Sequence, residues 1–171
     1  EVGVSHNTIR EWISVLEASY LVFRLRPYHA NLGKRPVKTP KLYFVDVGLA
    51  CHLLGIRERS QLLGHPLRGQ LFENLIIAEA LKQRMHAGLD NQLLFYRDQV
   101  GHEVDLLVES GPHLHAIEIK SSQTITPEFF KNLEYFAKLS GKVSQSLLVY
   151  GGDTVQKRST HSVLPRKQFQ L

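Results

Sequence analysis

The sequence has very little cysteine and no long apolar run. Its 171 residues include one cysteine, Cys51, which excludes an internal disulfide and a cysteine-based zinc cluster. No apolar run approaches the roughly 18 residues that a membrane-spanning helix needs. The first residues lack the basic and apolar regions of a signal peptide. We therefore expect a cytoplasmic protein that has no membrane partner.

Two kinds of functional motif are also missing. The chain contains no G-x(4)-G-K-[ST], so it has no P-loop and is not itself an ATPase. The histidines are scattered without a metal-ligand spacing, and the sequence suggests no Ser-His-Asp arrangement. The chemistry left to consider is that of carboxylates and lysines.

The charge is unevenly distributed along the chain. Residues 1–60 carry nine Lys and Arg against five Asp and Glu, residues 61–152 carry eight against ten, and residues 153–171 carry four against one. Basic flanks favour an anionic partner such as nucleic acid, and an acidic middle favours a cation. Ordinary charge on a solvated surface is the alternative explanation.

Hydrophobic spacing predicts an α/β protein in two parts. In residues 1–60 it predicts a helix, two strands and a short second helix, over 5–20, 21–28, 41–46 and 46–55. Helix, strand, loop and strand are typical of the end of a winged helix-turn-helix, whose earlier helices would precede Glu1. We expect Trp12 and Ile13 of the first helix to lie in the core.

Residues 61–171 predict a second domain with a mixed sheet. Its elements run in the order helix, three strands, helix and strand, over 69–87, 92–98, 102–109, 113–121, 127–139 and 144–151. Meandering strands with helices packed against them give an αβββαβ core.

The second and third of these strands form an acidic hairpin. A turn at Gly111-Pro112 makes Asp105 face Glu118 and Glu103 face Lys120, whereas a loop of three or five residues would shift this register. The four charged side chains then share one face of the hairpin. The opposite face collects the apolar residues Val104, Leu106, Val108, Ile117 and Ile119.

Facing carboxylates repel each other unless a proton or a cation lies between them. A hard divalent ion such as Mg²⁺ suits two carboxylates with waters and a phosphate. Lys120 would then orient a water nucleophile or contact a phosphoryl oxygen. Glu73, on an apolar face of the 69–87 helix, is a candidate third carboxylate. The alternatives are a solvated edge with salt bridges such as Glu103–Lys120, and a Glu73 that complements the helix dipole.

The same residues resemble the PD-(D/E)xK nuclease-like fold, in which an αβββαβ core presents Asp and Glu-x-Lys on neighbouring strands. The resemblance implies a restriction-endonuclease-like core in which Asp105 and Glu118 bind Mg²⁺ or Mn²⁺. It also implies that the Ile119 carbonyl adds a backbone ligand, that Lys120 is catalytic and that Glu73 is the helical acid.

Five sequence blocks extend the resemblance to nearly the whole chain. They are VSHNTIREWISVLEASYLVFRLRPY, KTPKLYFVDVGLACHLLG, GQLFENLIIAEAL, FYRDQVGHEVDLLVE and AIEIKSS. They look like the C-terminal DUF4143 region, behind a winged helix, of a prokaryotic AAA+-type ATPase family. This implies an upstream P-loop ATPase domain as a partner and a chain that starts within the winged helix. One departure from the nuclease motif is Glu103, which stands where that motif has Pro.

A winged helix implies contact with DNA through the start of its recognition helix and through its wing. The recognition-helix candidates are Ser5, His6, Asn7, Thr8 and Arg10, which combine groups for base edges and phosphates. The wing candidates are Arg24, Arg26, Lys34, Arg35 and Lys38. Winged helices also serve as domain connectors or protein contacts, so this alternative stays open.

The sequence supports two main hypotheses. The first is a C-terminal module of an AAA+-type ATPase with a nuclease-like fold, which hydrolyses nucleic-acid phosphodiesters with Mg²⁺ or Mn²⁺. The second is a non-catalytic module that binds DNA or a neighbouring protein and regulates the ATPase. A purely structural acidic cluster is a third reading of the same residues, and both a monomer and a homo-oligomer stay open.

Overall fold

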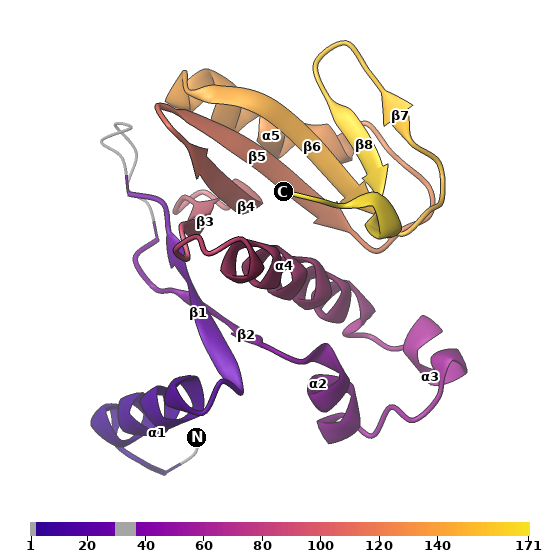
Figure 1. The fold of residues 1–171 in the computed structure, drawn as a ribbon. Coiled ribbons are helices and arrows are strands. Elements are labelled where there is room, and N and C mark those ends of the chain that lie inside the picture. Colours follow the sequence, from indigo (N-terminus) through magenta and orange to yellow (C-terminus); the bar gives the residue numbers. More distant parts are fainter. Residues whose placement is uncertain (1–2, 30–36) are drawn as a thin grey trace.

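The computed structural model describes residues 3–29 and 37–171. Within them, eight strands form one mixed sheet in the order β2-β1-β3-β4-β5-β6-β8-β7. The helices α4 (Arg68–His86) and α5 (Glu128–Ser140) cover its opposite faces (Figure 1). The predicted α/β class with a mixed sheet is confirmed, and the elements from α4 to β6 follow the predicted order.

Each face of the sheet has its own apolar core. On one face, α4 packs against the strands through Ile76 and Ile77. On the other face, α5 packs through Leu133 and Phe136, whose spacing of three places them on one side of the helix. The central strands are therefore covered on both faces, and two of their charged residues, Asp105 and Glu118, are buried.

The acidic hairpin consists of β4 (Glu103–Ser110) and β5 (His113–Lys120). The turn lies at Gly111-Pro112, where Gly111 has a φ of +59°, a conformation that glycine adopts without strain. Leu106 lies opposite Ile117 and Glu109 lies opposite Leu114, which confirms the predicted register over this part of the hairpin.

An irregularity at the start of β4 changes which way its side chains point. Strand β3 (Leu93–Arg97) pairs with β4 so that Leu94 faces Leu107 but Tyr96 faces Val104, which leaves one extra residue in β4. Such a bulge interrupts the alternation of side chains. Val104 therefore packs in the α5 core, and the prediction that it shares a face with Leu106 is wrong.

The N-terminal strands belong to the same sheet. Strand β1 (Val22–Pro27) pairs antiparallel with β2 (Lys41–Phe44) and parallel with β3. The sheet thus continues across the expected boundary between residues 60 and 61, and the division into two domains stays a prediction. Helix α2 (Val47–Leu53) follows Asp46, whose side chain caps it by accepting a hydrogen bond from the Gly48 N–H.

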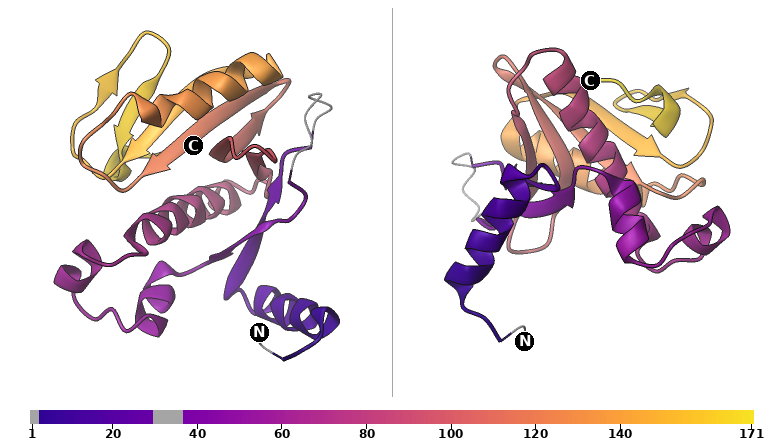
Figure 2. Two further views of the ribbon diagram at one scale, coloured as in Figure 1. Left: turned by 180° about the vertical axis from the view of Figure 1, so that it is seen from behind. Right: turned by 60° about the horizontal axis from the view of Figure 1, so that its bottom comes forward.

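Helix α1 (His6–Ala18) lies at one end of the molecule and buries none of its side chains (Figure 2). Trp12 is 52% exposed and Ile13 is partly exposed, so the prediction that they lie in the core is wrong. The physical reason is that helical spacing identifies an apolar face but not whether another element covers it.

The remaining elements complete the sheet and its connections. They are α3 (Arg59–Leu63), β6 (Val143–Tyr150), β7 (Gln156–Lys157), β8 (Ser162–Pro165) and a 3₁₀ turn at Arg166–Gln168. Over residues 3–29 and 37–171, no helix combines the length and the hydropathy that crossing a bilayer requires.

Candidate functional site

The hairpin brings three of the predicted site residues together. The Lys120 Nζ lies 2.6 Å from Glu118 Oε1 and 3.6 Å from Asp105 Oδ2. The backbone N–H of Ile119 donates a hydrogen bond of 2.8 Å to Asp105 Oδ2, which ties the two strands together at this point. The metal contact expected of the Ile119 carbonyl stays a prediction.

Both carboxylates of this group are deeply buried. The side chain of Glu118 is 5% exposed, and that of Asp105 is 9% exposed. Burial raises the pKa of Glu118 to about 8, and the neighbouring Asp105 adds to the shift. Burial also raises the pKa of Asp105 to about 6, although Lys120 opposes this shift. Asp105 and Glu118 therefore titrate as a pair, and burial favours the protonated form of each carboxyl group.

One oxygen of this buried pair is unsatisfied. Glu118 Oε2 has no hydrogen-bond partner among the described residues. A buried polar atom without a partner costs free energy, so such an atom calls for an explanation. The ability to bind a ligand at this atom is one such explanation.

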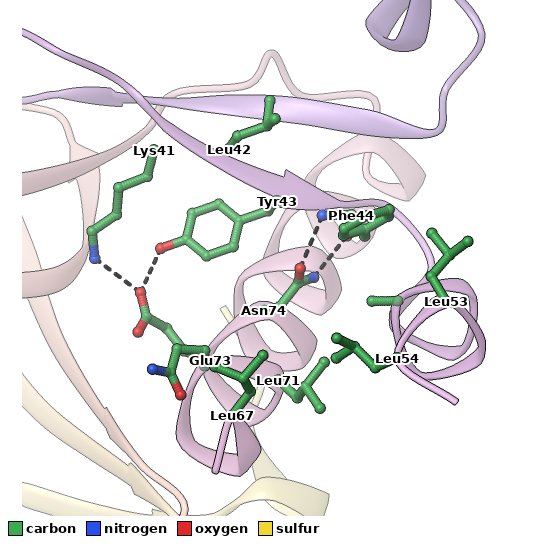
Figure 3. Close-up of a pocket in the computed structure, with 12 residues that line it drawn as sticks. Lys41, Leu42, Tyr43, Phe44, Leu53, Leu54, Leu67, Leu71, Glu73 and Asn74 are labelled. Carbon is green, nitrogen blue, oxygen red and sulfur yellow. Dashed lines mark hydrogen bonds and ion pairs between the residues drawn. The ribbon is translucent and has the colours of Figure 1, made fainter. Parts of the chain in front are cut away.

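A second group of charges meets the first from α4 and β2. The Lys41 Nζ lies 2.9 Å from Glu73 Oε1 and also forms an ion pair with Glu103. The hydroxyl of Tyr43 donates a hydrogen bond of 2.5 Å to the same Glu73 oxygen (Figure 3). Asn74, the next residue of α4, bonds the backbone N–H and C=O of Phe44 and so fixes β2 against the helix.

The charges in this second group reinforce one another. Burial alone would lower the pKa of Lys41, but Glu73 and Glu103 outweigh it and raise that pKa above its ordinary value. Burial and the Glu73 carboxylate raise the pKa of Tyr43, so the phenol stays protonated and remains a donor. Glu73 lies beyond the first turn of α4, and it bonds a neighbouring strand instead of only complementing the helix dipole.

The two groups together form one acidic cluster. Carboxylate oxygens of Glu73, Glu103 and Asp105 lie within 4.8 Å of one another. Glu103 pairs with Lys41 and with Arg97, whose Nε lies 3.4 Å away. The Glu103–Lys120 salt bridge of the alternative interpretation is not found among the described residues. The reason is the bulge in β4, because the predicted register assumed that side chains alternate regularly along this strand, and the bulge redirects the Glu103 side chain.

The sequence interpretation missed Lys41 and Tyr43. They occupy alternate positions of a short strand and therefore point to the same side of it. That pattern was the one available signal, since a lysine and a tyrosine spaced by two can reach one acceptor. Their partner Glu73 lies about 30 residues further along the chain, and nothing local indicates it.

Two cavities adjoin the cluster, and Gln70 and Glu73 of α4 line both. A cavity of about 390 Å³ lies between the start of α4 and the end of β5, where Lys120, Ser121 and Ser122 line it. A more apolar cavity of about 550 Å³ lies between β2, α2 and α4 (Figure 3). Lys120 and Glu73 therefore face a space that a small ligand or a phosphate group can enter.

The predicted DNA-contacting residues have different environments. On α1, His6, Asn7 and Arg10 are exposed. The hydroxyl of Ser5 is engaged as the helix cap and accepts a hydrogen bond from the backbone N–H of Thr8, 3.2 Å away.

Two of the residues predicted to form the wing, Arg24 and Arg26, lie near acidic side chains. Arg24 forms an ion pair with Glu17, and it lines a hollow of about 660 Å³ together with Arg26 and the acidic Glu109. Lys34 and Arg35 lie outside the described residues. Phosphate contact by these residues stays a prediction.

Models of two known protein families match two parts of the chain. A family model described as a domain of unknown function, DUF4143, matches residues 68–169. The chain belongs to the DUF4143 family. The matched region holds α4, the acidic hairpin and α5, so it contains Glu73, Asp105, Glu118 and Lys120. A second family model, also described as a domain of unknown function, DUF8612, matches residues 1–60.

Two curated proteins are similar to this DUF4143 chain. One is an uncharacterized protein of Mycobacterium bovis and the other an uncharacterized protein of Mycobacterium tuberculosis. Each is 32% identical over 152 residues, which covers 89% of this chain and 33% of the relative. The chain thus spans about a third of the length of the curated relatives that it matches.

Proposed function

We propose that this DUF4143 chain is a nuclease-like module that hydrolyses nucleic-acid phosphodiesters with Mg²⁺ or Mn²⁺. The observation that carries the proposal is the meeting of Asp105, Glu118 and Lys120 beside a cavity between α4 and β5. The order of helices and strands around them supports a restriction-endonuclease-like core, as the PD-(D/E)xK resemblance implies.

The side chains fit a hard divalent cation. Carboxylate oxygens are the ligands that Mg²⁺ and Mn²⁺ prefer, and three carboxylates have oxygens within 4.8 Å of one another. Glu118 adds a buried oxygen without a partner in the described part of the chain. Asp105 and Glu118 would hold the ion with the Ile119 carbonyl, and Glu73 and Glu103 would accept hydrogen bonds from the waters of its coordination shell.

The roles of the other residues follow from charge and position. A bound divalent cation supplies Lewis acidity at a phosphoryl oxygen and lowers the pKa of a bound water. Lys120 lines the cavity, where its ammonium group orients the attacking water or contacts a phosphoryl oxygen. Glu73 lines the same cavity and assists by accepting a hydrogen bond from that water.

The proposal includes contact with nucleic acid by the N-terminal part of the chain. His6, Asn7 and Arg10 are exposed at the start of α1, as the recognition helix of a winged helix requires. The proposal also includes an upstream AAA+-type ATPase domain in the full-length protein, since the curated relatives are about three times as long as the matched region.

Cleavage of single-stranded and double-stranded DNA in Mn²⁺ tests this proposal. Asp105→Ala should reduce the rate at least about a hundredfold, because it removes a carboxylate that binds the cation. Glu79→Ala is the control, since Glu79 is a carboxylate on α4 that lies outside the acidic cluster and pairs only with Lys82 among the described residues. Equal activity in wild type and Asp105→Ala would mean a contaminating nuclease and would remove the support for this site.

A second candidate function is a non-catalytic binding module. It is favoured by the fact that Lys41 and Lys120 already neutralise part of the acidic cluster. It is also favoured by α1, which exposes both basic and apolar side chains. A chain that binds DNA but does not cut it in Mn²⁺ would support this second function over the first.

A further inference from the structure

The side chain of Lys41 lies inside the acidic cluster. Its Nζ contacts Glu73 Oε1 at 2.9 Å, pairs with Glu103, and lies 5.3 Å from the centre of the Phe95 ring. The side chain is 22% exposed. Lys41 is thus a half-buried counter-ion, unlike a lysine that extends into water from the surface.

The ammonium group and a divalent cation need the same oxygens. Glu73 and Glu103 supply oxygens to the group of three carboxylates that also contains Asp105. A lysine carries a compact single charge that satisfies such oxygens without completing a coordination shell. A divalent cation placed among the same oxygens is repelled by the ammonium as long as the ammonium remains there.

The Lys41 side chain is also able to leave the acidic cluster. It starts β2, which is the edge strand of the sheet and pairs only with β1 within the described residues. The Lys41 side chain points toward Glu73 at the rim of the cavity of about 550 Å³ (Figure 3) and is 22% exposed, so its flexible stem can carry the ammonium group toward water without moving the backbone. Tyr43 keeps Glu73 in place when the lysine leaves, since its hydroxyl bonds the same oxygen.

We propose that Lys41 is a tethered counter-ion that competes with a divalent cation for Glu73 and Glu103. This inference rests on the proposed metal-dependent function and adds a form of regulation to it. Lys41 stabilises the acidic cluster of the metal-free protein and weakens the uptake of metal. Any contact that draws Lys41 away from the two carboxylates increases the affinity of the site for the cation.

Calorimetric titration of the 171-residue chain with Mn²⁺ tests the competition. Lys41→Met removes the charge but keeps an unbranched stem, and it should bind Mn²⁺ at least about tenfold more tightly than the wild type. Lys41→Arg keeps the charge and should stay within about threefold of the wild type. Lys82→Met removes a lysine that pairs with Glu79 on the surface of α4 and should leave the affinity unchanged.

The outcomes separate this inference from the proposed function. Tighter binding by Lys41→Met, including binding that appears only in this variant, supports the competition. Equal or weaker binding by Lys41→Met, with clear binding by the wild type, overturns the competition and leaves the proposed function standing. A lack of binding in every variant overturns both.

A measurement on the wild type covers the case in which Lys41→Met does not fold. Lysine side chains are labelled with ¹³C by reductive methylation, and the Lys41 signal is identified by its loss in Lys41→Arg. Mg²⁺ should move and narrow this signal as the side chain leaves the carboxylates. An unchanged Lys41 signal at saturating Mg²⁺ would overturn the competition.

Discussion

Two lysines contact the acidic cluster, and they meet it in different ways. Lys120 extends from β5, two residues beyond Glu118, and contacts carboxylates that are almost fully buried. Lys41 comes from β2 and contacts Glu73 and Glu103, whose side chains are 22% and 24% exposed. We call Asp105, Glu118 and Lys120 the deep half of the cluster, and Lys41, Tyr43, Glu73 and Glu103 its outer half. One hairpin builds the deep half, whereas the outer half needs the packing of β2 on α4.

This difference suits Lys120 to catalysis and Lys41 to regulation. A lysine fixed to buried carboxylates on its own hairpin suits a permanent role in orienting a water or a phosphate group. A lysine supplied by an edge strand, bound to more exposed carboxylates, suits a contact that breaks and re-forms. We expect substitutions in the deep half to remove activity, and substitutions in the outer half to tune it.

The largest expected effect is on the rate of cleavage. Lys120→Met should reduce the rate of DNA cleavage in Mn²⁺ by about 10²–10⁴-fold, the usual contribution of a positioned acid–base group. Lys41→Met should change the rate at saturating Mn²⁺ by less than about tenfold. An equal loss of rate in the two variants would contradict the division of the cluster into halves.

The next effect is on folding stability in the deep half. Asp105→Ala leaves the buried N–H of Ile119 without its acceptor, which costs about 1–3 kcal/mol of unfolding free energy. Asp105→Asn keeps an oxygen at this place and should lose less. Urea unfolding without metal checks both variants, and an equal loss in the two would mean that the hydrogen bond does not matter.

The pH dependence of stability should also come from the deep half. The pKa of Glu118 is about 8 in the folded chain and near its ordinary value of 4.5 in the unfolded chain. Between these values the folded state binds more protons than the unfolded state, so the stability of the metal-free protein falls as pH rises. Glu118→Gln should remove most of the fall between pH 6 and pH 8, since Asp105, with its pKa near 6, titrates at the lower end.

Thermal unfolding at a series of pH values, with EDTA present, measures this slope. Glu11→Gln serves as a control, because Glu11 is an exposed acid on α1. The same slope in wild type and Glu118→Gln would show that Glu118 is already ionised in the folded protein at neutral pH.

A smaller effect is expected in the outer half. Tyr43→Phe removes the hydroxyl that donates to Glu73 but keeps the ring that packs on Phe23. The expected loss is about 1 kcal/mol of unfolding free energy, the usual net value of one hydrogen bond. Urea unfolding of Tyr43→Phe and Asp105→Ala compares how much each half contributes to the unfolding free energy. A larger loss in Tyr43→Phe than in Asp105→Ala would contradict the expected order.

The smallest effect concerns the exposed helix α1. Arg10→Ala should weaken binding to double-stranded DNA and lower the slope of log affinity against log salt by about one. Arg24→Ala should change this slope less, because Arg24 is already paired with Glu17. Fluorescence anisotropy at several salt concentrations measures both, and an unchanged slope in Arg10→Ala would remove α1 from the DNA contact.

The deep half of the site could be predicted from the sequence because its determinants are local. Gly111 marks the turn, the alternation of apolar residues gives the register, and Glu118 and Lys120 are two positions apart on one strand. Each of these signals lies within about 20 residues of the others. The long helix α4 was also predicted, since an uninterrupted segment of this length is too long for a strand.

The outer half and the exposed helix could not be predicted in the same way. Lys41 and Glu73 meet only because β1 and β2 join the main sheet, and no local pattern specifies that pairing. The bulge that redirects Glu103 and Val104 depends on how β3 pairs with β4. Trp12 lies on an apolar helix face, but whether that face is covered depends on packing that the spacing does not encode.

The most direct test of the central claim is to locate the cation itself. Crystals of the chain grown with Mn²⁺ give an anomalous difference map in which the metal position is seen without reference to activity. The account predicts a peak within bonding distance of carboxylate oxygens of Asp105 and Glu118, with Lys41 withdrawn from Glu73 and Glu103. A fully formed cluster without a peak at saturating Mn²⁺, with Lys41 still bound to both carboxylates, would contradict it.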